Sequence, residues 1–246
     1  MNIIQPSVVF SDIDYKRFGI RAARANNVNE SNYSEVLSFC KDHDIVLLIA
    51  RCLSNEMKTV QKMQRDGFIL MDTLIYYVRS LIEPIPVDEG IATVRKFSPE
   101  DTDKIRAVAE KAFKGYRGHY HADERLPQHL CDEAYADWAF QSCTNPQFAD
   151  AIIVAEHQHE IKGFLTLKIR PPLLGEGILF GVSPETQGLG IGKSLMIFAL
   201  RWFQEQGLNQ MLISTQIVNL ASQKIWARLG FEISHAYYTF HKWFDE

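Results

Sequence analysis

The sequence is poor in several features, and each shortage excludes a class of protein. Only four of its 246 residues are cysteine. None of the four forms a C-x-x-C pair, so we interpret them as ordinary buried or half-buried thiols. No apolar run reaches the roughly 20 residues of a membrane-spanning helix. The first ten residues lack the basic start and the long apolar stretch of a signal peptide. We therefore expect a cytoplasmic protein without membrane insertion.

Basic residues are not in surplus either. The chain has 26 Lys and Arg against 30 Asp and Glu, which gives a formal net charge of −4 and a sequence pI near 6.1. This balance is not that of a general nucleic-acid binder, but a local basic pocket for a phosphorylated small molecule stays open. The 46% hydrophobic and 23% charged fractions are typical of a folded globular protein. The length allows one large domain or two of ordinary size.

The histidines do not form a metal-binding pattern. His119-x-His121 and His157-x-His159 are close pairs, but neither has a third ligand at a sensible spacing. The second pair also falls in an expected hairpin turn. We therefore expect no metal.

A break in composition divides the chain at residues 82–90. The run IEPIPVDEG contains two prolines, three acids and a terminal glycine, which is typical of an exposed connector. We predict two domains, residues 1–88 and 89–246. After the break, the order β-α-α-β-β-β-α-β-α-β predicts an α/β fold with a mixed sheet and helices on both faces. The expected strands are 91–97, 150–156, 161–170, 177–182, 210–216 and one or two within 231–243, and the expected helices are 98–113, 127–142, 189–206 and 220–229.

A glycine-rich turn between a strand and a helix is the sharpest motif. Residues 182–195 read VSPETQGLGIGKSL. Glycines let the backbone approach a ligand closely, and a helix N-terminus offers unpaired N–H groups and a partial positive charge. The motif therefore predicts a phosphate cradle. It is not a Walker loop, because Gln187 stands where the first glycine is needed, and Lys193 breaks the dinucleotide fingerprint.

The turn resembles the Q-x-x-G-x-G motif of the Gcn5-related N-acetyltransferase (GNAT) superfamily. Gln187, Gly190 and Gly192 match it, after a V-x-P lead-in. About 30 residues later, residues 219–231 (NLASQKIWARLGF) resemble the superfamily's N-x-x-A/S…Y-x-x-x-G-F block, with Trp226 in place of the tyrosine. The resemblance predicts a GNAT fold in the C-terminal half and an acyl-CoA-dependent N-acyltransferase.

By this resemblance, coenzyme A is the co-substrate and its pyrophosphate lies on the amides of residues 187–192. The strand at 177–182 would offer amides to the thioester carbonyl and so stabilise an oxyanion. The strand near residues 214–216 would splay away and leave a slot for the pantetheine arm, which Asn219 would contact. The predicted cofactor-binding residues are Phe180, Gly181, Val182, Gln187, Gly188, Leu189, Gly190, Ile191, Gly192, Lys193, Ser194, Asn219 and Trp226.

The acid and the base are harder to predict. Many superfamily members use a tyrosine acid where this chain has Trp226, whose indole N–H is not a useful acid at neutral pH. Tyr237, Tyr238 and His241 are the nearest replacements, although a structural role on an alternating strand is the competing interpretation. His119, His121 and Glu124 are candidate bases, unless the enzyme binds a neutral amine directly. The predicted catalytic residues are Tyr237, Tyr238 and His121.

The polar loop after residue 113 is expected to shape the acceptor pocket. An arginine there could hold a nucleotide phosphate, and an aromatic ring could stack on a base; the alternative is a solvated polar loop. The predicted substrate-binding residues are Tyr116, Arg117, His119, Tyr120 and Trp138.

Three short stretches resemble bacterial dTDP-fucosamine acetyltransferases. They are Arg17-Phe18-Gly19-Ile20, the run FKGYR at 113–117, and Ala236-Tyr237-Tyr238. This resemblance implies transfer of an acetyl or longer hydroxyacyl group, in a ternary complex, to a dTDP-linked amino-deoxy sugar, as in O-antigen biosynthesis. Two alternatives stay open: an N-acetyltransferase of a peptide, protein or other small-molecule amine, and a non-catalytic acyl-CoA sensor, which Trp226 keeps open.

The N-terminal region carries an internal match to the C-terminal one. Residues 58–68 align with residues 221–231, both ending in Gly-Phe. An apolar strand precedes each segment and a Tyr-Tyr strand follows each. We therefore predict a small α/β domain resembling the second half of a GNAT domain, although strand-helix-Gly-Phe-strand is a common pattern. Without a Q-x-x-G-x-G equivalent it should not bind coenzyme A, and it would pack on the catalytic half or assist homodimerisation.

Overall fold

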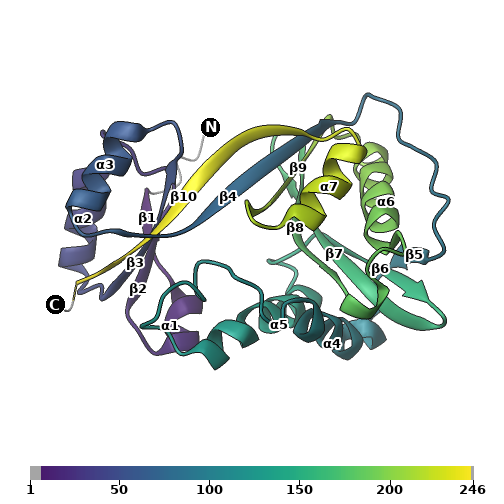
Figure 1. The fold of residues 1–246 in the computed structure, drawn as a ribbon, viewed down its shortest axis with the longest axis horizontal. Helices are drawn as coiled ribbons and strands as arrows, with labels where there is room; N and C mark the ends of the chain where they lie inside the picture. Colours follow the sequence, from purple (N-terminus) through teal and green to yellow (C-terminus); the bar gives the residue numbers. More distant parts are fainter. Residues whose placement is uncertain (1–6, 245–246) are drawn as a thin grey trace. The chain divides into compact units, whose positions relative to one another are not determined.

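The computed structural model describes residues 7–244, which form two compact units (Figure 1). Within these residues, the first unit comprises 7–75, 117–131 and 235–244, and the second comprises 76–116 and 132–234. The units therefore interleave along the chain. The domain boundary between residues 88 and 89 stays a prediction about the sequence.

The first unit is built on strands in the order β1-β2-β3-β10. Strands β2 and β3 are parallel, and the other neighbours are antiparallel. The run LLIARCL of β3 is largely apolar, as expected of a strand with partners on both edges. The elements are β1 (Val8–Phe10), α1 (Asp12–Phe18), β2 (Ala22–Ala25), α2 (Tyr33–Asp42), β3 (Leu47–Leu53), α3 (Met57–Arg65) and the part of β10 (Glu232–Trp243) from residue 235 onward.

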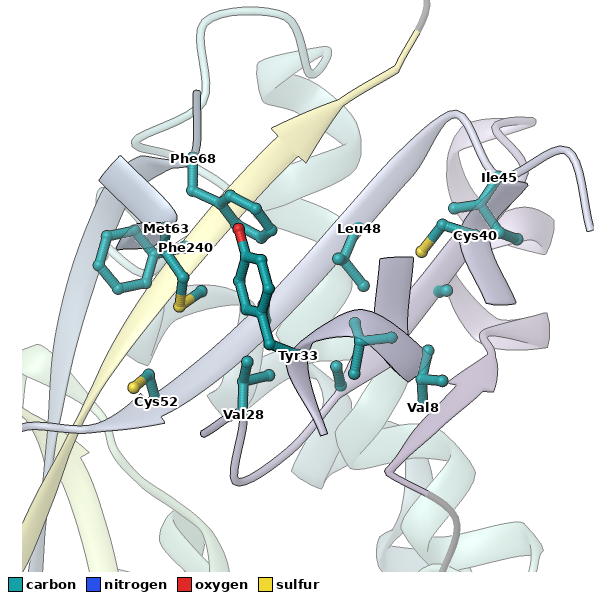
Figure 2. Close-up of a cluster of buried hydrophobic side chains, with 14 of the residues drawn as sticks. Val8, Val28, Tyr33, Cys40, Ile45, Leu48, Cys52, Met63, Phe68 and Phe240 are labelled. Atoms are coloured by element: carbon teal, nitrogen blue, oxygen red, sulfur yellow. The ribbon is translucent and has the colours of Figure 1, made fainter. Parts of the chain in front are cut away.

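Helices α2 and α3 cover one face of this sheet over an apolar core (Figure 2). Phe68 and Phe240 meet edge to face, with ring centroids 6.5 Å apart. Met63 and Leu48 are fully buried beside them. This packing holds α2 and α3 on the sheet, because burial of such side chains contributes about 1.5–3 kcal/mol each.

The second unit contains the predicted mixed sheet, in the order β4-β9-β8-β7-β6-β5. Only β8 and β9 are parallel among the pairs described. Figure 1 shows α4 and α5 on one face of this sheet and α6 and α7 on the other. The predicted element order is confirmed. The elements are β4 (Ile69–Ser80, from residue 76), β5 (Thr93–Lys96), α4 (Thr102–Ala112), α5 (Gln128–Thr144, from residue 132), β6 (Ala151–His157), β7 (Glu160–Arg170), β8 (Leu174–Val182), α6 (Ile191–Glu205), β9 (Gln210–Gln216), α7 (Leu220–Arg228) and β10 as far as residue 234.

The connector at residues 82–90 is mostly exposed, as predicted, but it and the adjoining Leu81 are anchored along α6. Gln204 Nε2 donates to the carbonyl of Leu81 at 2.8 Å. Arg201 Nη2 donates to the carbonyl of Pro86 at 3.1 Å. Ser194 Oγ donates to Asp88 Oδ1 at 3.0 Å. The segment therefore follows the helix from its last turn to its first.

The internal repeat is confirmed in element length and register. Strand β3, helix α3 and strand β4 recur as β9, α7 and β10, and every first and last residue lies 163 positions later. The parallel pairs recur too, because Ala22↔Leu47 through Ala25↔Ala50 matches Leu174↔Gln210 through Gly177↔Ile213. The two Tyr-Tyr pairs lie on the corresponding strands β4 and β10, but not at corresponding positions, because by this offset Tyr76 corresponds to position 239.

Candidate functional site

Strands β8 and β9 separate where the sequence predicts a slot. Their last pair is Gly177↔Ile213, although β8 continues to Val182 and β9 to Gln216. The register of β8 against β7 shifts at the same point, so that Ile178 is the extra residue of a bulge. A bulge bends and twists its strand. It therefore turns the end of β8 away from β9 and leaves an opening between the two strands.

The turn after β8 presents a run of unpaired amides. Gly188 and Gly190 have φ values of 86° and 83°, which an L side chain adopts only with strain. Gly190 is the N-cap of α6 and provides no side-chain cap. Among the backbone hydrogen bonds of the described residues, none uses the N–H of Gly188, Gly190, Ile191, Gly192 or Lys193. Residues 187–190 are exposed, so their N–H groups are open to a ligand. That this cradle of amides holds a phosphate stays a prediction.

The corresponding turn of the first unit is closed by its own groups. The N–H of Val28 donates to the carbonyl of Arg51 at 2.9 Å, and that of Tyr33 donates to the carbonyl of Asn29 at 3.1 Å. Asn32 Oδ1 accepts from the N–H of Asn29 at 2.9 Å, and Asn29 Oδ1 accepts from that of Ser31 at 2.9 Å. The first unit therefore has the same strand arrangement, but amides of its turn are hydrogen-bonded within the chain.

Ion pairs and one exposed lysine lie near the turn of the second unit. Lys111 Nζ and Lys162 Nζ lie 3.5 and 3.6 Å from Glu185 Oε1. A backbone hydrogen bond, a hydrogen bond with Ser183 and the charge of Lys111 lower the pKa of Glu185, so this carboxylate is ionised and paired at neutral pH. Lys193 is exposed in the first turn of α6. Lys162 also pairs with Glu160 at 2.5 Å, so both Lys111 and Lys162 have carboxylate partners. The charge that favours an anionic ligand is that of Lys193, together with the helix dipole.

The side chain of Asn219 makes its hydrogen bonds within the protein. It is the N-cap of α7, and its Oδ1 accepts from the N–H of Ser222 at 3.3 Å. Its Nδ2 donates to Thr215 Oγ1 at 2.9 Å and to Ser222 Oγ at 3.1 Å. The predicted contact with pantetheine stays a prediction. The observed bonds give the residue a structural role, because they hold the end of β9 against the start of α7.

Trp226 lies in the core, with 1% of its surface exposed. Its ring meets Tyr77 edge to face at 5.5 Å, and its Nε1 has no partner among the described residues. Tyr77 donates to Gln223 Oε1 at 3.1 Å. The indole thus packs α7 onto β4, which explains why a large ring stands at this position.

Two predicted acceptor residues join an aromatic cluster on α4 and α5. Tyr116 meets Phe113 at 5.3 Å and Tyr135 at 5.1 Å. Phe113 and Tyr135 are stacked at 4.6 Å, and Trp138 lies 6.5 Å from Tyr135. Tyr116 and Trp138 are half-buried in this group. Their role toward a substrate stays a prediction.

The other predicted acceptor residues belong to the first unit. Tyr120 is buried and donates to Asp14 Oδ1 at 2.5 Å, while Arg24 donates both to Tyr120 and to Asp14. Burial and the nearby carboxylate raise the pKa of Tyr120 to about 12. Its hydroxyl therefore serves a buried ion pair. Arg117 is exposed.

The predicted catalytic residues also belong to the first unit. Tyr237 donates to Asn27 Oδ1. Tyr238 packs against the core cluster, 6.4 Å from the ring of Phe240. His121 is half-buried in the loop after residue 117. The observed contacts of the two tyrosines are those of strand residues, and the catalytic roles stay predictions.

Asp123, His241 and His119 form a hydrogen-bonded chain that the sequence did not predict. His241 Nδ1 lies 2.6 Å from Asp123 Oδ2, and His241 Nε2 lies 3.0 Å from His119 Nδ1. All three residues are buried. Neither Asp123 nor its pairing with a histidine 118 residues away leaves a local signal in the sequence. Among residues 7–244, no group of three His, Cys, Asp or Glu side chains is arranged to hold a metal ion.

Comparisons with known proteins agree with this geometry. Residues 113–231 match the model of the acetyltransferase (GNAT) family. The mycothiol acetyltransferase of Arthrobacter sp. (strain FB24) is 28% identical over 144 residues, which cover 56% of this chain and 42% of that protein. The chain therefore spans less than half the length of this curated relative. Mycothiol acetyltransferase is also the name of a relative from Streptomyces coelicolor that is 33% identical over 146 residues.

Solved structures show the fold. A GCN5-related N-acetyltransferase from Sphaerobacter thermophilus superposes with a TM-score of 0.67 at 14% identity, covering 96% of this chain and 75% of that one. A tandem GNAT protein from the clavulanic acid biosynthesis pathway gives a TM-score of 0.63 at 11% identity, covering 92% of this chain and 76% of that one. The predicted GNAT fold is confirmed.

The predicted sugar-nucleotide specificity finds no support in these relatives, whose names mention mycothiol and no nucleotide sugar. In the part of the chain that the structure describes, no helix has the length and apolar character needed to cross a membrane. The chain has the GNAT fold, and its residues 113–231 match the model of the acetyltransferase (GNAT) family.

Proposed function

We propose that this protein is an acyl-CoA-dependent N-acetyltransferase of a small-molecule amine, with its coenzyme A site in the second unit. The observation that carries the proposal is the opening of β8 from β9 after Gly177 and Ile213, followed directly by the amide cradle at residues 188–193. An elongated ligand with a pyrophosphate at one end and a thioester at the other suits a slot that ends on such a cradle.

The chain's own groups account for the expected chemistry. Antiparallel pairing with β7 uses alternate residues of β8 only, so only the other amides at 178–182 face the opening, and Leu179 is not among them because its N–H donates to Thr166 Oγ1 on β7 at 3.0 Å. One of them would donate to the thioester oxygen as it becomes an oxyanion. The amine nitrogen forms a bond to the carbonyl carbon, the C–S bond breaks, and the amine loses one proton while the thiolate of coenzyme A gains one.

The acyl group and the acceptor are argued from different sources. The names of the curated relatives contain "acetyltransferase", which favours acetyl over the hydroxyacyl group. The same names favour an acceptor related to mycothiol. The three short stretches shared with dTDP-fucosamine acetyltransferases favour a dTDP-linked amino sugar. Both acceptors are small-molecule amines, so the proposed function holds with either one.

A non-catalytic acyl-CoA sensor is the second candidate. The observation in its favour is Trp226, which is buried and occupies the position where many GNAT enzymes carry a tyrosine acid. Such a protein would bind acetyl-CoA through the same cradle without releasing its thiol. A homodimer is a further prediction that the sequence makes and that light scattering would test.

Thiol release from acetyl-CoA tests the proposal. The amines are the desacetyl form of mycothiol, a panel of dTDP-linked amino sugars and a basic peptide, with a hydroxyacyl-CoA as a second donor. Release with a small-molecule amine is the expected result, and the best amine identifies the acceptor. Release with the peptide alone would assign a protein substrate. Calorimetric binding of acetyl-CoA without any release would favour the sensor.

A further inference from the structure

The connector contacts the first turn of α6 through the side chain of Asp88. Ser194 lies in that turn and is buried, with 1% of its surface exposed. Its Oγ donates to Asp88 Oδ1 at 3.0 Å, and the same carboxylate oxygen accepts from the N–H of Gly90 at 3.0 Å. A single oxygen atom of Asp88 therefore joins the helix to the end of the connector.

The contact between the connector and the helix requires a glycine at position 90. A Cβ atom on Gly90 would stand 2.1 Å from Ser194 Oγ and 3.0 Å from Asp88 Oδ1. Non-bonded heavy atoms pack at about 3.5–4.0 Å, so a side chain would either rotate the hydroxyl out of its hydrogen bond or lift the connector from α6. The backbone of residue 90 thus approaches Ser194 as closely as only glycine allows.

Ser194 adjoins the cradle. Its N–H donates to the carbonyl of Gly190 at 3.0 Å, which closes the first turn of α6 on its N-cap. The N–H groups of residues 190–193 precede it directly and donate to no backbone acceptor among the described residues. A displacement of Ser194 would therefore move the turn that carries these amides.

Asp88 is the anchor of the connector at the cradle end of α6. Towards the other end of the helix, Gln204 Nε2 donates to the carbonyl of Leu81 at 2.8 Å. Gln204 lies about 15 Å from Ser194 along the helix axis, at a rise of 1.5 Å per residue. The anchor that can set the position of the first turn is therefore Asp88.

We infer that Asp88 is a positioning residue of the coenzyme A site: through Ser194 it holds the first turn of α6 where the cradle amides can bind the pyrophosphate. The inference rests on the proposed function and deepens it, because it couples the connector to the ligand. Coupling between two sites is reciprocal. A ligand on the cradle should therefore hold the connector more firmly against the helix.

The carboxylate of Asp88 has two effects of opposite sign. Its hydrogen bond to Ser194 positions the cradle and favours binding, whereas its negative charge disfavours an anionic ligand nearby. Asp88→Ala removes both the hydrogen bond and the charge. Asp88→Asn removes the charge but keeps an oxygen that accepts from Ser194. Positioning therefore predicts weaker binding for the alanine variant and not for the asparagine variant.

Calorimetry with acetyl-CoA on the whole protein measures this difference. Coupling between sites typically changes an affinity by roughly 5–150-fold, and we expect the low end, a loss of about tenfold, for Asp88→Ala. Asp88→Asn should bind at least as tightly as the wild type. In the thiol-release assay, Asp88→Ala should raise the KM for acetyl-CoA by the same factor and leave kcat unchanged, because a bound ligand itself holds the first turn.

Matched controls come from the same connector and helix. Glu89→Ala removes the neighbouring carboxylate, which is exposed, and Gln204→Ala removes the anchor at the other end of α6. Both should bind acetyl-CoA with wild-type affinity. Gly90→Ala should weaken binding as Asp88→Ala does. Adding Ser194→Ala removes the clashing hydroxyl, so the double variant should bind no more weakly than Ser194→Ala alone.

Limited proteolysis of the wild-type protein tests the reciprocal effect. A protease specific for glutamate can cleave after Glu89, where the connector is exposed, and mass spectrometry identifies that cut. Acetyl-CoA should slow this cleavage in the wild type but much less in Asp88→Ala. If Asp88→Ala does not fold, the wild-type cleavage rates decide.

Three results would overturn the role of Asp88 while leaving the proposed function in place. They are wild-type affinity in Asp88→Ala, an equal loss in Asp88→Asn and Asp88→Ala, and a wild-type cleavage rate that acetyl-CoA does not change. A wild-type protein that binds no acetyl-CoA would overturn the proposed function as well.

Discussion

Gly192, at the start of α6, lies so close to Phe180 that a Cβ atom on the glycine would stand 3.0 Å from Cζ of that ring. The same atom would stand 3.1 Å from Cδ1 of Ile225 on α7. The first turn of the helix is thus pressed between the end of β8 and α7. Because two of the unpaired amides belong to its neighbours Ile191 and Lys193, this contact sets where the cradle lies relative to β8.

Gly192→Ala is expected to weaken coenzyme A binding. Overpacking costs about 1–3 kcal/mol, and a displacement of the first turn moves the amides that hold the ligand, so we expect an affinity loss of about tenfold. Adding Ile225→Val removes one of the two crowded atoms and should recover part of the loss. Isothermal titration of both variants, with Ile225→Val alone as the control, measures this. Unchanged affinity in Gly192→Ala would mean that coenzyme A does not bind at the cradle.

One molecule of coenzyme A per chain is expected to bind. The repeat of the first unit has the same strand register, but its turn is closed by Val28 and by the side chains of Asn29 and Asn32. Calorimetry should therefore give a stoichiometry of one. Gly190→Val, at a φ of 83°, should abolish the binding. A second site, or binding that survives this change, would contradict the closed turn.

Truncation of Trp226 is expected to destabilise the second unit. Loss of a fully buried tryptophan costs about 3–5 kcal/mol, so Trp226→Ala should shift the urea midpoint strongly. Trp226→Phe should cost less, because it keeps a ring against Tyr77 and removes an indole N–H that has no partner among the described residues. If both variants lose the same stability, the edge-to-face contact contributes little.

Acid should remove the contribution of Asp14 to stability. Burial raises the pKa of Asp14, but the charge and hydrogen bonds of Arg24, with bonds from Ser11 and Tyr120, outweigh it, so the folded-state pKa lies below 3.8. A depressed carboxyl pKa stabilises the fold above the unfolded-state pKa, and the effect is lost as pH falls through the folded-state pKa. Urea denaturation between pH 7 and pH 2 measures this loss.

Asp14→Asn provides the control for this acid effect. It leaves Arg24 without its charge partner, which typically costs about 3–5 kcal/mol for a buried pair. We expect the low end, because 34% of the Arg24 side chain is exposed. The variant should also lose less stability than the wild type between pH 5 and pH 2. Equal acid sensitivity would mean that other carboxylates dominate.

Local patterns were sufficient for the elements and for the cradle. The strand at 210–216 begins and ends where predicted, because turn residues flank a short apolar run. Ser98 caps the following helical segment, with Pro99 at its first position as predicted. The glycine motif placed the unpaired amides correctly, since both the positive φ values and the helix start depend on residues adjacent in the sequence.

Long-range contacts decided the rest. Asp123 and His241 are separated by 118 residues, so neither side chain predicts the other. From the sequence, Tyr120 is expected to be an aromatic residue of an exposed loop. In the structure its hydroxyl donates to Asp14, which is 106 residues away in the chain. Asn219 likewise suggests a ligand contact from its motif, while its bonds to Thr215 and Ser222 are visible only in three dimensions.

The unpaired amides of the cradle also make the stability of the fold depend on whether a ligand is bound. The N–H groups of Gly188, Gly190, Ile191, Gly192 and Lys193 donate to no backbone acceptor among the described residues, so a bound pyrophosphate would supply bonds that exist only in the folded state. A ligand that binds the folded form alone adds RT ln(1 + [L]/Kd) to its stability, about 2.7 kcal/mol at a hundredfold excess over Kd. The melting temperature of this protein, and its lifetime against proteases, would then follow the supply of coenzyme A in the cell.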